Sequence, residues 1–219
     1  MTPTTIIERT RRNEEARQAR RDDILAAARR VFATRGFRGT TIADIAEEAH
    51  IALGTIYLYF ESKVDVFGAL NDEFNRIIAA AITDVPERIL TLQETVRIRI
   101  DNVFAACDTN RDLVRLVVLN TDPESAASRR MRAADELRTS PMVRIIRGAM
   151  DSGAIRDGDA EIVTKLTLGL VSIAVYQAFV ISDGSDAAKY RDTCSEMIIA
   201  HMTPAPAPGE RTGTRLRSA

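Results

Sequence analysis

Apolar residues recur at helical spacing along most of this 219-residue chain. Between residues 20 and 35, for example, Ile24, Ala28 and Phe32 follow one another at intervals of four and so share one side of a helix. No segment shows the period-two alternation of apolar and polar residues that is typical of a half-buried strand. We therefore expect an all-α protein with about nine helices. The predicted helices cover residues 20–35, 42–49, 53–59, 63–84, 91–108, 111–119, 123–150, 160–182 and 185–202.

Helix-capping residues support several of these boundaries. Thr41 with Asp44, and Ser62 with Asp65, have the spacing of capping boxes, in which a hydroxyl and a carboxylate satisfy free backbone N–H groups. Gly36 follows the first helix, where the chain often needs a left-handed conformation. These signals predict two short helices and then a long one.

The composition changes at both ends of the chain. Residues 1–19 are polar and charged and carry no apolar stripe, so we expect a flexible basic arm. Residues 203–219 are rich in proline and lack periodicity, which predicts a disordered tail. Between them we expect a small three-helix domain at residues 20–63 and a larger helical domain at residues 64–202.

Positive charge is concentrated near the N-terminus, although the whole chain has a net charge of −1. The first 40 residues contain ten arginines and only five acidic residues. Such an asymmetry indicates an anionic partner. The alternative is an arginine-rich helix face that only water contacts, and charge alone does not separate the two.

The residues needed for enzyme chemistry are scarce. The chain has two histidines, His50 and His201, and two cysteines, Cys107 and Cys194, which are far apart in apolar helical patterns. No Cys–His pair, phosphate-binding glycine loop or metal motif is present, so we predict no enzyme activity, no cofactor and no metal site. The cysteines are expected to be buried free thiols.

Localisation follows from two further observations. No apolar secretory signal precedes the first helix. The longest apolar stretch, Leu166 to Ile181, has 16 residues, several of them polar, and is expected to be too short and too polar for a membrane span. We expect a cytoplasmic protein without a membrane partner.

The segment after the first helix has the features of a helix-turn-helix, whose second helix enters the DNA major groove. In that helix, Gly54 permits close backbone approach, and Leu53 can contact a thymine methyl group. The hydroxyls of Thr55 and Tyr57 can donate to phosphates, and Tyr59 can reach the groove wall. The joint spacing of these residues indicates a DNA-binding surface.

Three further residues are candidate phosphate contacts. Thr40 and Thr41 precede the first of the two short helices, at residues 42–49, where free N–H groups attract an anion. Lys63 begins the long helix, where a cation is unfavourable for the helix dipole and a phosphate would explain it. Several of the candidate DNA contacts also have an ordinary explanation. Thr41 is a good N-cap, Lys63 can be a surface lysine, and Tyr57 and Tyr59 can serve a protein interface.

A set of residues between positions 20 and 67 carries a family resemblance. Its members are Ile24, Leu25, Ala28, Phe32, Gly36, Phe37, Thr40, Thr41, Ile45, Ala46, Gly54, Thr55, Ile56, Tyr57, Tyr59, Phe60, Ser62 and Lys63. In these residues the chain resembles the DNA-binding domain of the tetracycline-repressor (TetR) family of bacterial regulators. The resemblance implies phosphate contacts from Thr41, Thr55, Tyr57 and Lys63. It places four residues nearest the bases, namely Ala43, Leu53, Gly54 and Tyr59. Because two of these four are apolar, DNA shape should contribute much of the specificity.

The resemblance also implies that the larger domain forms a homodimer and binds a small effector. The helix at residues 160–182 supports a dimer independently, because it is apolar nearly all round in its second half and needs cover on more than one side. The alternative is the central helix of a monomer. The predicted interface residues are Leu166, Gly169, Ile173 and Ala174.

An effector pocket is expected among the apolar stretches of the larger domain. An apolar lining favours a hydrophobic ligand, and polar residues within it are candidate contacts. For each polar residue the alternative is a hydrogen-bonded group of the core or an interface. The predicted pocket residues are Asn102, Phe104, Leu116, Asn120, Tyr176 and Gln177, with Thr167 as a further polar candidate.

The sequence therefore predicts a ligand-responsive transcriptional regulator. We expect a repressor that binds a palindromic operator in double-stranded DNA as a dimer and is released when the effector binds. The alternative is a helical small-molecule-binding adaptor, or an enzyme, without DNA binding. The missing catalytic motifs and the full set of phosphate-contact candidates favour the regulator.

Overall fold

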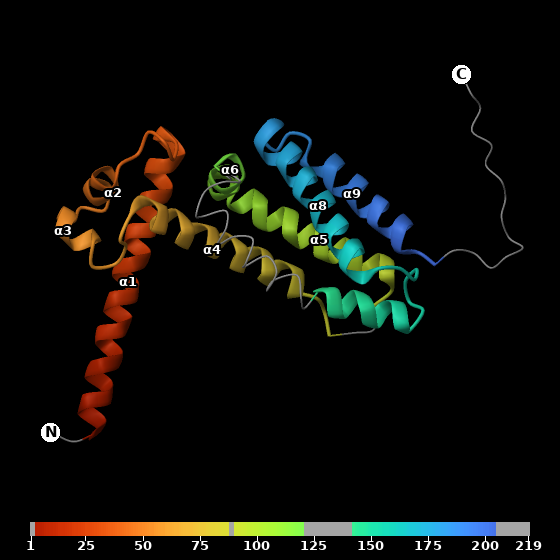
Figure 1. Ribbon diagram of the computed structural model, residues 1–219, viewed down its shortest axis with the longest axis horizontal. Coiled ribbons are helices and arrows are strands. Elements are labelled where there is room, and N and C mark those ends of the chain that lie inside the picture. Colours follow the sequence, from red (N-terminus) through yellow and green to blue (C-terminus); the bar gives the residue numbers. More distant parts are fainter. Residues whose placement is uncertain (1–2, 88–89, 121–141, 205–219) are drawn as a thin grey trace, which may run out of the picture.

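The computed structural model describes residues 3–87, 90–120 and 142–204, and none of these residues lies in a strand. The all-α prediction is confirmed for them. Most of the predicted helix at 123–150 and of the predicted tail at 203–219 lies outside the described residues. Figure 1 shows the small N-terminal unit at one end of the molecule and the larger helical body at the other. The elements are α1 (Pro3–Arg35), α2 (Ile42–Glu48), α3 (Leu53–Ile56), α4 (Lys63–Thr83), α5 (Leu92–Thr109), α6 (Arg111–Leu119), α8 (Ala160–Val175), the π-helical η1 (Tyr176–Ile181) and α9 (Ala187–Met202), with a further helical segment at residues 142–151.

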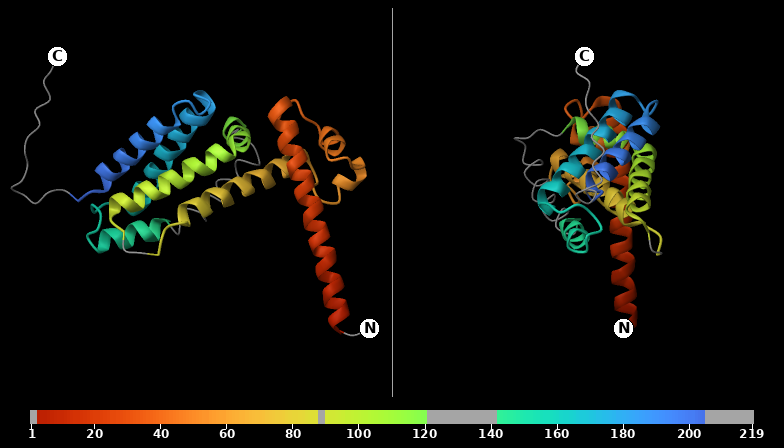
Figure 2. Two further views of the ribbon diagram at one scale, coloured as in Figure 1. Left: turned by 180° about the vertical axis from the view of Figure 1, so that it is seen from behind. Right: turned by 90° about the vertical axis from the view of Figure 1, so that its right-hand side faces the viewer.

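The first helix is longer than the sequence predicts. A flexible arm is expected before residue 20, whereas α1 begins at Pro3. No glycine or proline interrupts the chain between Pro3 and Gly36, and Arg11 pairs with Glu15 at 3.4 Å along the helix. Residues 8–20 are all exposed, and Figure 2 shows this half of α1 extending away from the rest of the molecule. The missing apolar stripe therefore indicated exposure and not the loss of helix.

Two short helices follow α1 after a tight corner. Gly36 adopts a positive φ of 69°, and its N–H donates to a carbonyl one turn earlier at 2.9 Å, which ends α1. Thr41 and Asp44 form the predicted capping box of α2. His50, with φ of 53°, lies in the turn before α3. The second helix of the pair is shorter than predicted, because residues 57–59 form a turn.

A first apolar core joins α1, α2 and α3 and continues past residue 63. Ile24, Ile45 and Ile56, one from each helix, are fully buried in it. The same cluster contains residues of α4 and α6, so the N-terminal unit shares its core with the first half of α4 and one side of α6. Its members from these two helices are Val66, Phe67, Ala69, Leu70, Leu113, Leu116 and Val117.

A second apolar core fills the larger domain. It is built from α5, α8, η1, α9 and residues 142–151, and α5, α8 and α9 run beside one another in Figure 1. The rings of Phe104 on α5 and Phe179 on η1 lie 5.8 Å apart within it. The predicted single helix at 160–182 therefore exists, but it changes from α- to π-geometry at Tyr176.

The helical run Ala160–Ile181 differs from the sequence-based expectation about membrane spans. With 22 residues, this helix is long enough and apolar enough to cross a bilayer, judged by length and composition alone. It is longer than the apolar stretch that the sequence analysis marked because it begins six residues before Leu166, the start of that stretch. Core helices of soluble proteins meet the same criterion. Only 28% of its most apolar window is buried, so this helix presents an uncovered apolar face.

Two helices, α4 and α6, belong to both cores. On α4, Phe74 packs against both clusters. On α6, Leu113 is buried in the first cluster, and the next residue, Val114, is buried in the second. Since both cores are close-packed, a displacement of either helix has to be accommodated in both domains.

A polar network fixes α1 to the same junction. The Arg29 guanidinium donates to both carboxylate oxygens of Asp112, at 2.9 and 2.8 Å, and to the carboxylate of Glu73 at 3.3 Å. A further hydrogen bond reaches the Asn110 side chain at 3.3 Å. The hydrogen bond from Arg29 is the main reason why the pKa of Asp112 lies below its ordinary value. The network thus connects α1 with α4 and α6 through one half-buried cation.

We expect Asp112→Asn to lower the free energy of unfolding at neutral pH by roughly 1 kcal/mol, since the paired carboxylate is partly exposed and bidentate. A carboxyl with a lowered pKa stabilises the fold above its unfolded pKa, and this contribution is lost as the pH falls. The difference between variant and wild type should therefore shrink below about pH 4. Urea unfolding at several pH values measures it. The exposed Asp151→Asn serves as a control, and a pH-independent difference for Asp112→Asn would contradict this account.

Candidate nucleic-acid interface and ligand cavity

The residues expected to approach DNA lie on α2, on α3 and in the turn after α3, at the end of the molecule opposite α9 (Figure 1). Leu53 and Tyr57 are 45% and 51% exposed. Ala43 and Gly54 are exposed as well. Leu58, which the sequence analysis did not select, is 71% exposed and adds an uncovered apolar side chain to this surface. The fold therefore brings residues from both short helices to an accessible surface.

Gly54 has no internal reason to be a glycine. A Cβ atom added there meets no atom of the protein within 4 Å. A glycine inside a helix costs about 1 kcal/mol relative to alanine, because its unfolded state is freer. The missing side chain thus leaves space on the outer side of α3, where another molecule can approach the backbone.

The two threonines before α2 have different roles. Thr40 is buried, and its hydroxyl donates to the Gly36 carbonyl at 2.8 Å. This internal hydrogen bond corrects the expectation that the Thr40 side chain meets a phosphate. Thr41 is exposed, and its hydroxyl bonds to the Asp44 carboxylate at 2.7 Å. The backbone hydrogen bond from Thr41, together with that hydroxyl, holds the pKa of Asp44 below its ordinary value.

Lys63 is held by the N-terminal unit itself. Its ammonium donates to the carbonyls of Phe37 and Thr40, at 2.7 and 2.6 Å, and lies 4.5 Å from the centre of the Phe37 ring. Although Lys63 begins α4, its charge therefore satisfies carbonyls in the turn after α1. An ammonium has three N–H donors, so one remains for an outside anion. The sequence analysis missed this internal role because the acceptors lie more than twenty residues earlier in the chain.

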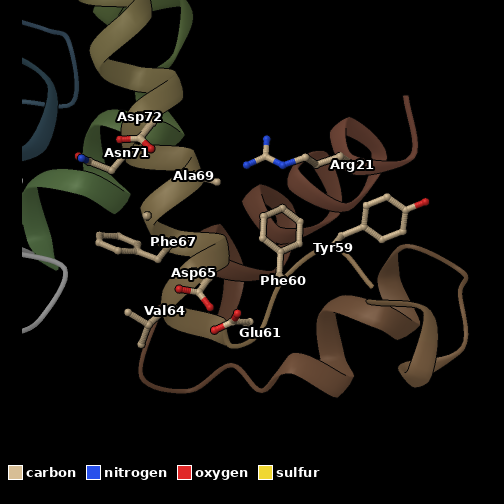
Figure 3. Close-up of a pocket in the computed structure, with 11 residues that line it drawn as sticks. Arg21, Tyr59, Phe60, Glu61, Val64, Asp65, Phe67, Ala69, Asn71 and Asp72 are labelled. Carbon is tan, nitrogen blue, oxygen red and sulfur yellow. The ribbon is translucent and has the colours of Figure 1, made fainter. Parts of the chain in front are cut away.

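A shallow hollow lies beside this unit, between α1, the turn after α3 and the start of α4 (Figure 3). Arg21 lies over the Phe60 ring, 5.0 Å from its centre. Tyr59 lines the same hollow, with its hydroxyl directed away from α4 in Figure 3. The described lining contains three carboxylates, of Glu61, Asp65 and Asp72, and one cation, Arg21. Because negative charge exceeds positive charge there, the hollow is unfavourable for a phosphate.

The larger domain contains a cavity of about 410 Å³. Its walls come from α4, α5, α8, α9 and residues 142–155, and they are mainly aliphatic and aromatic. Phe74, Ile78 and Ile82 of α4 contribute to the lining. Volume and lining are typical of sites for small organic ligands.

The six predicted pocket residues do not line this cavity. Asn102 instead donates to the carbonyls of Ala81 and Asp84, at 3.2 and 2.6 Å, and so secures the C-terminal end of α4. Asn120 donates to the Leu116 carbonyl at 2.8 Å at the end of α6. For these two residues, the hydrogen-bonded alternative is the correct one.

The four other predicted pocket residues are used for packing. Phe104 packs against Phe179 in the second core, with the two rings tilted by 53°, and Leu116 belongs to the first core. Tyr176 and Gln177 are half-buried in η1. Thr167 does line the cavity. The sequence does not reveal which side of each helix faces the cavity, because that depends on the packing of five segments.

One lining residue carried a signal that the sequence analysis did not use. Arg99 on α5 falls within the inward stripe formed by Val96, Ile100 and Val103, where an apolar residue is expected. Cys107, one helical turn after Val103, is buried as predicted. Burial raises the pKa of its thiol to about 12.

The predicted dimer residues of α8 divide between surface and core. Leu166 and Ile173 are 65% and 51% exposed, and Gly169 is exposed. Ala174, in contrast, is buried in the second core, which corrects its place in the predicted interface. Ile162, at 56% exposure, extends the uncovered stripe because it precedes Leu166 by four residues. On α9, Met197 is likewise exposed.

Comparisons with known proteins agree with this arrangement. The model for "Bacterial regulatory proteins, tetR family" matches residues 24–70. The transcriptional regulator HbdR of Aromatoleum sp. (strain CIB) is 31% identical over 143 residues, which are 64% of this chain and 61% of that protein. The transcriptional repressor KstR of Mycolicibacterium smegmatis is 36% identical over 80 residues, covering 36% of this chain and 39% of that protein. These alignments span less than two thirds of either relative.

A solved structure extends the likeness to the whole fold. The regulator FadR of Bacillus subtilis, in complex with stearoyl-CoA, superposes with a TM-score of 0.72 and 21% sequence identity, covering 82% of this chain and 98% of that one. The fold and its exposed short helices thus define a helix-turn-helix protein with a helical body. More specifically, residues 24–70 match the model of the TetR family of bacterial regulatory proteins, and the relatives that the chain resembles are transcriptional regulators. These relatives are named as transcriptional regulators, which agrees with the prediction that the chain is not an enzyme.

We expect Lys63→Met to lower the free energy of unfolding by about 1–2 kcal/mol, because the two carbonyls lose a charged donor. Chemical denaturation without DNA measures it. Lys189, which is exposed and pairs only with Asp186 among the described residues, provides the control, and Lys189→Met should change stability by less than about 0.5 kcal/mol. Equal effects of the two substitutions would show that Lys63 is an ordinary surface lysine.

Proposed function

We propose that the protein is a ligand-responsive transcriptional repressor of the cytoplasm. Two copies bind a palindromic operator, and a small hydrophobic effector in the body releases them. The observation that carries the proposal is the course of α4. This helix starts at Lys63, which holds the N-terminal unit through two carbonyls, and it ends in the wall of the cavity with Phe74, Ile78 and Ile82.

The coupling follows from the two cores. A ligand between α4 and α5 changes the position of α4, and Phe74 and α6 transmit that change because they pack in both cores. In a dimer, two recognition helices must lie about 34–36 Å apart to enter successive major grooves. A ligand that favours another separation lowers the affinity for DNA, and DNA lowers the affinity for the ligand by the same factor.

In this proposal the DNA-contacting residues divide by chemistry. Thr41, Thr55, Tyr57 and Lys63 contact phosphates through their hydroxyls and the remaining N–H of the lysine. Ala43, Leu53, Gly54 and Tyr59 lie nearest the base edges. The exposure of Leu53, Gly54 and Tyr57 supports this division, and Thr40 supports the corner from inside.

The uncovered stripe on α8 supports a homodimer. Ile162, Leu166 and Ile173 are each more than half exposed, and a water-exposed apolar stripe of this kind marks an interaction surface. Gly169 in the same stripe allows close approach of a second helix. A pair of α8 and α9 helices from each protomer would form a four-helix bundle.

Support for a hydrophobic effector comes from the cavity lining, and support for repression comes from relatives. The apolar walls favour an apolar ligand, and FadR, a structure with a similar fold, is in complex with stearoyl-CoA, which supports a ligand of this kind. KstR is named as a repressor. A helical small-molecule-binding adaptor without DNA binding is the competing function.

The proposal is tested by selecting bound duplexes from a random DNA pool and titrating the selected duplex at several salt concentrations. We expect a palindromic consensus, and an affinity that falls steeply with salt because phosphate contacts release counterions. Failure to enrich any sequence at low salt would favour the adaptor. A reporter gene behind the selected sequence separates repression, which lowers expression, from activation.

Single substitutions separate the two kinds of contact. Tyr57→Phe should weaken binding of all duplexes by about two- to tenfold, because one hydrogen bond to a phosphate is lost. Leu53→Asn should instead change the ranking of duplexes. Tyr190→Phe, in the body, is the matched control. If Tyr57→Phe left affinity unchanged, the phosphate assignment would be wrong.

Leu166→Glu should convert the dimer to a monomer, since it places a charge in the apolar stripe. Sedimentation velocity measures the change. Leu58→Glu, at an equally exposed apolar position outside α8, should leave the dimer intact. A monomeric wild type, or a Leu166→Glu variant that remains dimeric, would refute this interface.

A further inference from the structure

The cavity of the body contains one charge. Arg99 is the only charged residue among the described residues that line it. Its neighbours along α5, Val96, Ile100 and Val103, are apolar, and so are the residues that α4 contributes. A cation in such surroundings is costly unless an anion or several acceptors satisfy it.

Within the described chain, Arg99 lacks such a partner. Its Nε atom is buried and makes no hydrogen bond. The hydroxyls of Thr95 and Thr164, which also line the cavity, donate to the carbonyls of Thr91 and Ala160 in their own helices, at 2.9 and 2.7 Å. Burial lowers the pKa of Arg99, and among the described residues no carboxylate opposes that effect. A guanidinium nevertheless remains protonated at neutral pH.

Two other half-buried cations of the described residues, Arg29 and Lys63, are satisfied. Arg29 donates to two carboxylates, and Lys63 donates to two carbonyls. Arg29 and Lys63 thus have acceptors from the fold itself, in contrast to Arg99. At Arg99 the acceptor has to come from outside the described chain.

We propose that the effector is an amphiphile with one anionic head group, a carboxylate or a phosphate, and an apolar tail, and that Arg99 binds the head group. The inference rests on the proposed function, because it specifies the ligand of the same cavity. A guanidinium matches both head groups with two parallel hydrogen bonds. The tail then lies along the apolar walls, which include Phe74, Ile78 and Ile82 of α4.

The test is a titration of the full-length dimer with straight-chain carboxylates from octanoate to hexadecanoate, and with the alcohol and amine of each length. Isothermal calorimetry should show that the best carboxylate binds about ten- to a hundredfold more tightly than its alcohol, with the amine weaker still. Arg99→Gln should abolish the difference between carboxylate and alcohol, whereas Arg99→Lys should retain part of it. The matched control is Arg97→Gln, two residues earlier on the exposed side of α5, which should change nothing.

A second readout does not require the right tail length. In the ligand-free protein, Arg99→Met should maintain or raise the melting temperature, because it removes a half-buried cation whose Nε–H is buried without an acceptor. A merely structural arginine would behave in the opposite way, and its replacement would lower the melting temperature. That result, or equal affinity for carboxylate and alcohol in the wild type, would overturn the proposal.

The source of the head group and the regulatory role are tested separately. Comparing each fatty acid with its coenzyme A thioester, in wild type and Arg99→Gln, shows whether Arg99 meets a carboxylate or a phosphate. The same ligands are then added to the complex with selected DNA. Arg99-dependent binding that leaves the DNA complex intact supports the ligand class and refutes effector release. DNA release by the alcohol as strongly as by the acid supports release and refutes the anionic head group.

Discussion

The rest of the structure depends on the packing of α4 and α6 into two apolar cores at once. Adjacent residues of α6, Leu113 and Val114, are buried on opposite sides, one in each core. Phe74 has the same double role on α4. Because neither core can change shape without its neighbour, the N-terminal unit and the cavity are mechanically connected although no residue of α2 or α3 lines the cavity.

Three of the half-buried cations differ in what satisfies their charge. Arg29 holds α1 to α4 and α6 through carboxylates, and Lys63 holds the start of α4 to the corner after α1 through carbonyls. Both cations thus stabilise contacts between segments at the junction of the two domains. Arg99, in the cavity wall, has no such acceptor within the described chain. Two cations therefore maintain the connection between the domains, and the third is positioned where a ligand can influence it.

Features that depend on residues close together in the sequence could be predicted. Features that depend on contacts between distant segments could not. The capping box at Thr41, the left-handed Gly36 and the bounds of α6 all follow from short-range rules, and the structure confirms them. The six predicted pocket residues do not line the cavity, because periodicity identifies an apolar stripe and not the segment that covers it. Asn102 illustrates the point, since its acceptors lie at the end of α4, about twenty residues earlier. The helical arm before residue 20 was missed because exposure was taken as flexibility.

Lys63 has an evolutionary consequence. Under the proposed function, Lys63 serves both the corner after α1 and an outside phosphate, and the internal role persists when the external one disappears. A descendant of this protein that no longer recognised an operator would still need its lysine, and for the same reason its Thr40. The presence of Lys63 and Thr40 therefore does not by itself indicate that such a chain binds DNA. Gly54 and Tyr57, which the interior does not need, are the positions where such a loss would first become visible in the sequence.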